Sequence, residues 1–129
     1  MDPVKVLQMA YQDELLDALR AEGAAQGVPY PHVRALLLEV ARRERAHAEA
    51  LAEALRRRGA PLPPTPKPEE GGWETLLRLL SEEGLDRAYY LESTFPDPEL
   101  EALFTRLGQE ERLNQEAVRK AVMLIGGGL

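Results

Sequence analysis

Residues 59–72 read GAPLPPTPKPEEGG, and this proline-rich stretch decides how the remaining segments can be arranged. Its prolines favour extended polyproline geometry, which advances about 3.1 Å per residue, so the stretch can reach roughly 40 Å. The preceding segment, 31–58, would also be about 40 Å long as a helix, at about 1.5 Å per residue. The stretch can therefore run the full length of a helix and act as a crossover. The alternative is a surface linker without topological meaning.

Prolines and glycines divide the chain into four segments with helical patterns. Pro31 and Pro98 suit the first turn of a helix, while Gly27 and Gly59 suit the position just past a helix end. No stretch alternates apolar and polar residues between turn signals, so strands are not expected. The sequence predicts an all-α protein with helices at 3–26, 31–58, 73–93 and 98–125.

The connections between these helices differ in length, and the difference predicts the topology. The short connectors 27–30 and 94–97 each predict an antiparallel helical hairpin. The crossover 59–72 joins the two hairpins, which is the connectivity of a ferritin-like four-helix bundle rather than a simple up-down-up-down bundle. A chain of 129 residues is long enough to bury one core, so we expect a single domain, 1–129.

Composition and charge exclude several classes of protein. The chain has no cysteine, which excludes disulfide scaffolds and iron–sulfur clusters and fits a reducing compartment, with the cytoplasm as the expected location. The net charge of −6 argues against a nucleic-acid partner. The basic cluster 56–58 would lie in a last helical turn, where arginines complement the helix dipole. The first ten residues lack a signal-peptide pattern, and no apolar run is long enough for a membrane span.

Two of the predicted helices carry an apolar stripe that is interrupted by polar residues at the same place. In each stripe a glutamate is followed three residues later by a second polar residue, Glu44 with His47 and Glu111 with Asn114. Residues three apart share a helix face, so Glu44 and His47 can offer a carboxylate oxygen and an imidazole nitrogen to one metal ion. The stripes comprise Val33, Leu37, Val40, Glu44, His47, Leu51 and Ala54, and Leu100, Phe104, Leu107, Glu111, Asn114, Val118, Ala121 and Ile125.

The other two helices each add one glutamate that fits the same plane. Glu14 lies on an apolar stripe of segment 3–26, and Glu83 flanks one in segment 73–93. Each of the four glutamates lies 13 residues from the glycine or proline at its own turn, which is roughly 20 Å along a helix. Glu82 and Glu92 compete with Glu83 for this position. Tyr11, Tyr89 and Tyr90 are interpreted as packing residues, with hydrogen-bond donation to the ligands or a redox role as the alternatives.

On these residues the chain resembles the ferritin-like carboxylate proteins, and rubrerythrin-type domains in particular. In that family two helices each give a glutamate and two each give Glu-x-x-His, which together bind two iron or manganese ions. The resemblance implies that Glu14, Glu44 and His47 serve one ion and that Glu83 and Glu111 serve the other. Asn114 stands where the family has its second histidine and is a weaker ligand, so one or two ions are expected. The cysteine module that rubrerythrins carry is absent.

Two functional hypotheses follow. The first is a non-haem iron or manganese redox protein, such as a di-iron or di-manganese oxidoreductase, that acts on oxygen, peroxide or Fe(II). The second is a ferritin-like bundle that binds no metal and serves as a structural or self-association module, in which His47 and Asn114 complete a buried polar network. An iron-storage cage is a weaker third hypothesis because there is no fifth helix. The abundant apolar positions around segments 31–58 and 98–125, together with the dimers common in the family that the chain resembles, predict a homodimer.

Overall fold

The structure is a computed structural model that describes residues 2–68, 89–93 and 95–126. Three long helices lie within these residues, α1 (Pro3–Gln26), α2 (Pro31–Arg57) and α4 (Pro98–Gly126), and residues 89–92 are also helical. The described residues contain no strand, so the all-α class is confirmed. The predicted bounds of these three helices agree with the structure to within one residue. Most of the predicted helix 73–93 lies outside the described residues.

Prolines and glycines lie at the helix ends, as the sequence predicts, and the structure adds a side-chain cap at the start of α1. The Asp2 carboxylate accepts a hydrogen bond from the backbone N–H of Val4 at 3.0 Å, which satisfies an amide that the first turn of α1 leaves unpaired. Just past the C-terminal end of α2, Gly59 has a φ of +65°, a left-handed backbone conformation that residues with a Cβ rarely adopt. The chain can therefore leave α2 sharply at this glycine and enter the crossover.

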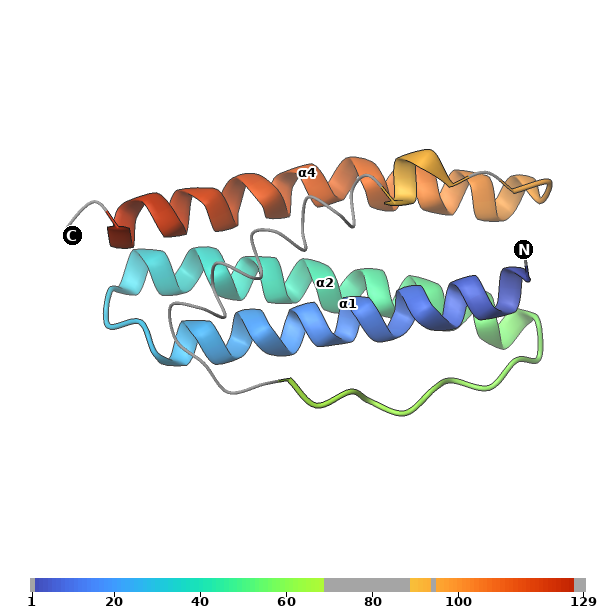
Figure 1. The fold of residues 1–129 in the computed structure, drawn as a ribbon, viewed down its shortest axis with the longest axis horizontal. Coiled ribbons are helices and arrows are strands. Elements are labelled where there is room, and N and C mark those ends of the chain that lie inside the picture. The colour runs from blue at the N-terminus through green and yellow to red at the C-terminus, as the bar shows by residue number, and fades with distance from the viewer. Residues whose placement is uncertain (1, 69–88, 94, 127–129) are drawn as a thin grey trace.

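The described part of the crossover runs alongside α1 (Figure 1). The side-chain amide of Gln8 donates to the carbonyl of Pro61 at 3.0 Å, and that of Gln12 donates to the carbonyl of Pro64 at 3.1 Å. Prolines have no N–H of their own, so the two glutamines supply donors to a segment that cannot form a backbone ladder. These contacts favour the interpretation of residues 59–68 as an ordered crossover over a free surface linker.

The basic residues at the end of α2 bind the start of α4. Nη2 of Arg57 lies 2.8 Å from Oε1 of Glu99, and Arg58 forms a salt bridge with Asp97. Asp97 in turn accepts a hydrogen bond from the backbone N–H of Glu99 at 2.9 Å, so it caps the first turn of α4. The arginines therefore contact a neighbouring helix in addition to lying in the last turn of their own, where they complement its dipole.

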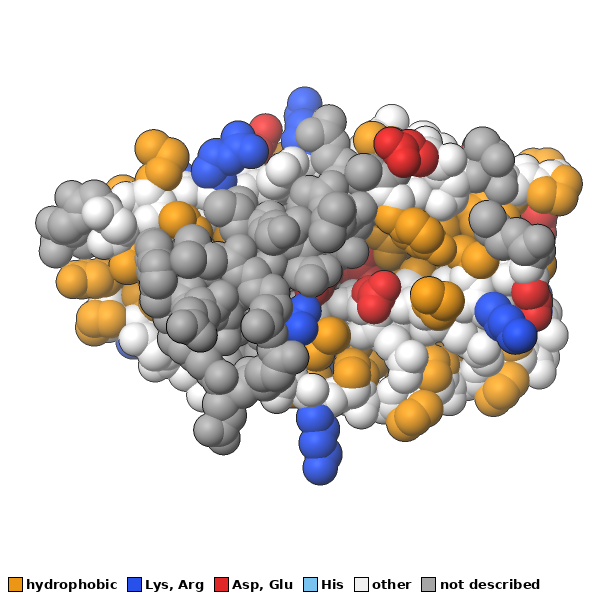
Figure 2. All heavy atoms as spheres, in the orientation of Figure 1, with side chains coloured by type: hydrophobic (Ala, Val, Ile, Leu, Met, Phe, Trp, Pro, Cys, Tyr) orange, Lys and Arg blue, Asp and Glu red, His pale blue; other side chains and the backbone are white. Residues whose placement is uncertain are grey.

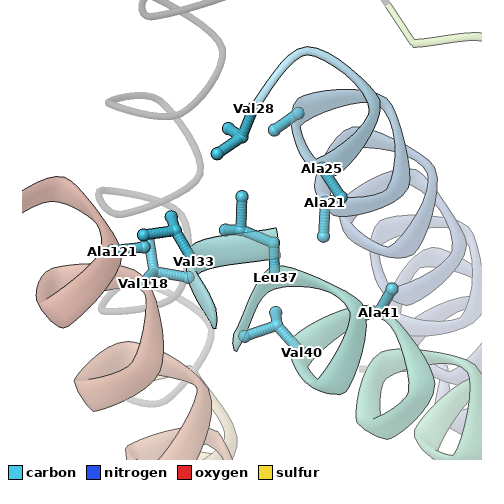
Figure 3. Close-up of a cluster of buried hydrophobic side chains, with 10 residues drawn as sticks. Ala21, Ala25, Val28, Val33, Leu37, Val40, Ala41, Val118 and Ala121 are labelled. Atoms are coloured by element: carbon cyan, nitrogen blue, oxygen red, sulfur yellow. The ribbon is translucent and has the colours of Figure 1, made fainter. Parts of the chain in front are cut away.

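The buried side chains form two apolar clusters, one toward each end of the bundle, with a polar layer between them. Helices α1, α2 and α4 contribute to both clusters, and Figure 3 shows the one nearer the loop between α1 and α2. The second cluster includes Phe104, whose ring packs edge-on against those of Tyr90 and Phe95. The first comprises Ala21, Ala24, Ala25, Val28, Val33, Leu37, Val40, Ala41, Val118 and Ala121. The second comprises Val6, Leu7, Ala10, Leu51, Ala54, Leu55, Tyr90, Leu100, Phe104 and Leu107.

Large apolar side chains also remain on the surface. Met9, Leu38, Leu113 and Met123 are between 42% and 68% exposed. In Figure 2 apolar side chains lie among isolated charged ones on the part of that face that is not grey. None of the described helices combines the length and apolarity that crossing a bilayer requires.

Candidate metal site

The polar layer between the two clusters contains five of the six predicted ligands. Glu14 comes from α1, Glu44 and His47 come from α2, and Glu111 and Asn114 come from α4. All five are buried, with at most 2% of the residue exposed. Glu14, Glu44, His47 and Glu111 can each offer one ligand atom such that the four atoms lie within 4.8 Å of one another. The sixth predicted ligand, Glu83, lies outside the described residues, as does Glu82.

The helical spacing explains why these side chains meet. On α2 and α4 the two polar residues lie three apart, so each pair points the same way from its helix. The apolar residues one turn to either side, such as Val40 and Leu51 on α2, are fully buried and fix the face that each helix turns inward. The glutamates must therefore be buried with them, and burying a carboxylate is costly unless a cation, a proton or hydrogen bonds compensate.

His47 lies at the centre of the layer. Its Nδ1 is 3.1 Å from Oε1 of Glu111 and 3.5 Å from Oε2 of Glu14, while its Nε2 is 3.3 Å from Oε1 of Glu110. Burial by itself would lower the pKa of the imidazole, but the hydrogen bond with Glu111 and the nearby carboxylates of Glu111 and Glu14 outweigh this effect and raise the pKa to about 10. Without a metal ion, His47 is therefore the cation that the carboxylates surround.

The pKa of the Glu14 carboxyl is higher than that of an ordinary surface glutamate. Burial and the neighbouring charge of Glu111 raise its pKa to about 7, although contacts with Glu44 and His47 act against this rise. The hydroxyl of Tyr90 donates a hydrogen bond to Oε1 of Glu14 at 2.6 Å, so this tyrosine is a donor and also a packing residue, as its edge-on contact with Phe104 shows. The layer therefore holds a proton at neutral pH, and a divalent cation that binds here would displace this proton.

Asn114 connects two other side chains within the layer. Its carbonyl oxygen accepts a hydrogen bond from Nη1 of Arg43 at 2.7 Å, and its amide nitrogen donates to Oε1 of Glu44. A guanidinium can only donate and a carboxylate is an acceptor, so this orientation of the amide satisfies both neighbours. In this arrangement Asn114 turns its NH₂ group, and not its oxygen, toward Glu44.

Comparison with protein-family models matches residues 5–122 to rubrerythrin. The chain belongs to the rubrerythrin family. This confirms the resemblance inferred from the glutamate and histidine pattern, and it confirms the ferritin-like fold class. No curated protein and no solved structure gives a significant match.

The residues of this rubrerythrin-family chain fit a metal ion of the kind that the family implies. Three carboxylates and one imidazole surround a single position, and Oε2 of Glu14 lies farther from Nδ1 of His47 than an ordinary hydrogen bond. Oxygen-rich ligation with a single nitrogen suits iron or manganese better than copper or zinc. The chemistry of the donor set therefore supports a metal-binding ferritin-like protein.

Several polar residues beside the site were not predicted from the sequence. Arg43 and Glu110 each precede a predicted ligand by one residue and reach the layer through side-chain length, which no stripe pattern reveals. Asp17 and Arg20 are buried on α1, with Nη1 of Arg20 3.6 Å from Oδ1 of Asp17. Asp17 lies three residues after Glu14 on the same helix face, so the helical spacing could have identified it.

Proposed function

We propose that this rubrerythrin-family protein binds iron or manganese at Glu14, Glu44, His47 and Glu111 and uses it for redox chemistry on oxygen, peroxide or Fe(II). The observation that supports the proposal is the convergence of one imidazole and three carboxylates from three helices on one buried position. Such a set is expensive to bury without a cation. A bound iron or manganese ion would supply one-electron redox chemistry at that position.

The protein's own groups have separate roles in this proposal. The carboxylates of Glu14, Glu44 and Glu111 would hold the ion, and Nδ1 of His47, without its proton, would be the nitrogen ligand. Nε2 of His47 would then keep its hydrogen and donate a hydrogen bond to Glu110, and this bond fixes the orientation of the ring. The Glu110 side chain is 38% exposed, so this hydrogen bond lies at the solvent side of the site.

The apolar clusters on either side complete the site. Leu51, Leu107 and Phe104 on one side and Val40 and Val118 on the other are all at most 1% exposed. They exclude water from the layer, which strengthens the attraction between an ion and its carboxylates. The position of Glu83 as a ligand to a second ion stays a prediction.

Metal content of the purified protein tests the proposal. We expect wild-type protein reconstituted with Fe(II) or Mn²⁺ at neutral pH to retain metal after desalting, and His47→Ala to lose most of it. Asn114→Ala should retain metal, because its amide faces Glu44 as a donor. Inductively coupled plasma mass spectrometry gives the stoichiometry for each variant.

The second hypothesis, a metal-free structural bundle, predicts a different pair of results. In that case His47 serves only as the donor that holds Glu111 and Glu14 in the core. Wild-type protein would then take up no iron or manganese. His47→Ala would lower the melting temperature, because the carboxylates would remain buried without the imidazole, which lowers the free energy of unfolding by about 1 to 3 kcal/mol. That outcome would reject the metal proposal in favour of a structural role.

A further inference from the structure

The side chain of Arg43 places a positive charge beside the carboxylate layer. Arg43 is only 18% exposed, and its guanidinium points inward from α2 to the carbonyl oxygen of Asn114, with an Nη1 to Oδ1 distance of 2.7 Å. Its Nη2 is held from the surface side by Glu39 at 3.3 Å. The guanidinium is therefore fixed at both ends, and its positive charge is held beside the layer.

The charge of Arg43 reaches the carboxylate layer through one amide. Asn114 accepts from Arg43 with its oxygen and donates to Glu44 with its nitrogen, so the two hydrogen bonds polarise each other in the same direction. Asn114 occupies the position at which the family pattern has an imidazole that would bind a second ion. In this chain the same position delivers a positive end of a dipole, backed by a full positive charge.

We propose that the Arg43–Asn114 relay takes the place of the second metal ion and limits the site to one divalent ion per chain. The inference rests on the proposed function, since it concerns how many ions the site accepts. Arg43 acts through Asn114 and is a positioning residue. It fixes the Asn114 side chain so that the amide oxygen points away from Glu44, and the positive charge of Arg43 opposes the binding of a further cation at the same place.

The number of Mn²⁺ ions bound per chain, measured by equilibrium dialysis and mass spectrometry of the metal, tests the relay. Wild type should bind one ion. Asn114→His restores a nitrogen ligand but leaves the guanidinium in place, so its second ion should bind weakly. Arg43→Gln combined with Asn114→His should bind the second ion at least about tenfold more tightly than Asn114→His alone, the size of effect that groups behind metal ligands commonly have.

Arg42 provides a matched control. It is the neighbouring arginine on α2 and also lies 3.3 Å from Glu39, but its side chain is 71% exposed. Arg42→Gln combined with Asn114→His removes the same charge from the same helix, and its second ion should bind as weakly as in Asn114→His. If the Arg42 and Arg43 double variants bind the second ion equally, the guanidinium of Arg43 has no specific role and the inference is wrong.

Other outcomes separate this inference from the proposed function. Two tightly bound ions in wild type would overturn the inference and leave the proposed function standing, whereas no ion in any variant would overturn both. No ion in wild type but uptake by the Arg43 double variant would also overturn both, because the inference requires one bound ion in wild type. If that double variant does not fold, Arg43→Gln alone serves instead: a second ion should bind at least about tenfold more tightly than in wild type, and an unchanged isotherm would overturn the inference.

Discussion

The stability of the metal-free protein is expected to fall as the pH rises, because Glu14 and His47 both hold a proton more tightly in the folded chain than in the unfolded chain. The pKa of Glu14 is about 7 instead of 4.5, and that of His47 is about 10 instead of 6.5. Between the unfolded and folded values of each group the native state binds more protons, so the free energy of unfolding decreases with pH. The contribution of Glu14 is lost between about pH 4.5 and 7, and that of His47 between about pH 6.5 and 10.

The size of the effect follows from the displaced pKa of Glu14. At about 1.4 kcal/mol per pH unit, a rise from 4.5 to about 7 corresponds to about 3 kcal/mol of stability. Glu14 and His47 contact each other, so their contributions are not additive. For a domain of this size 1 kcal/mol shifts the melting temperature by about 4 °C, which predicts a fall of about 10 °C between pH 5 and pH 8 from this layer.

Thermal unfolding followed by circular dichroism in excess chelator measures this slope. Glu14→Gln keeps the size of the side chain and removes its ionisation, so its melting temperature should change much less than that of wild type between pH 5 and 7. Glu116→Gln, at a side chain that is 61% exposed, should follow wild type. A wild-type protein that becomes more stable toward pH 8, or a Glu14→Gln slope equal to that of wild type, would refute the reasoning.

Three further substitutions test the packing around the site. Gly108→Ala should destabilise the protein by about 1 to 3 kcal/mol, because an added Cβ would lie 2.7 Å from the Leu91 side chain, and chemical denaturation measures the loss. Gly23→Ala should instead stabilise α1 by about 0.5 to 1 kcal/mol in the same assay, since nothing lies within 4 Å of the added Cβ. Tyr90→Phe removes the hydroxyl that donates to Glu14 and should cost about 1.5 to 3 kcal/mol in metal-free protein at pH 8, where the carboxylate is charged. Melts at pH 5 should show a smaller difference between Tyr90→Phe and wild type.

Much of the site was predictable because helical periodicity controls it. The step of three between Glu44 and His47, repeated by Glu111 and Asn114, identifies the inward faces of α2 and α4 without knowledge of their packing. Glu14 is placed by its apolar stripe and by its distance from the turn, which matches that of Glu44 because the two helices of a hairpin start level with each other. The structure brings these residues together in one buried layer.

The relay could not be predicted in the same way. Arg43 precedes Glu44, so its Cβ points about 100° away around the helix, and in the sequence it belongs to a charged run typical of a solvated face. Only the length of its side chain and the register of α2 against α4 bring it to Asn114. Glu110 reaches His47 for the same reason. Contacts that depend on rotamers between helices leave no period in the sequence.

The polar layer between the two apolar clusters also determines how α2 and α4 align. Apolar residues repeat along both helices, so these residues alone would also accept a bundle in which one helix had slipped by a turn, about 5.4 Å. Such a slip would bring Glu111 to the level of Leu51 in one direction, or Asn114 to the level of Val40 in the other. Either alignment would strand a buried polar group in an apolar cluster, at a cost comparable to that of a lost buried hydrogen bond. A layer suited to holding an ion therefore also rejects misaligned bundles while the chain folds, before any ion arrives.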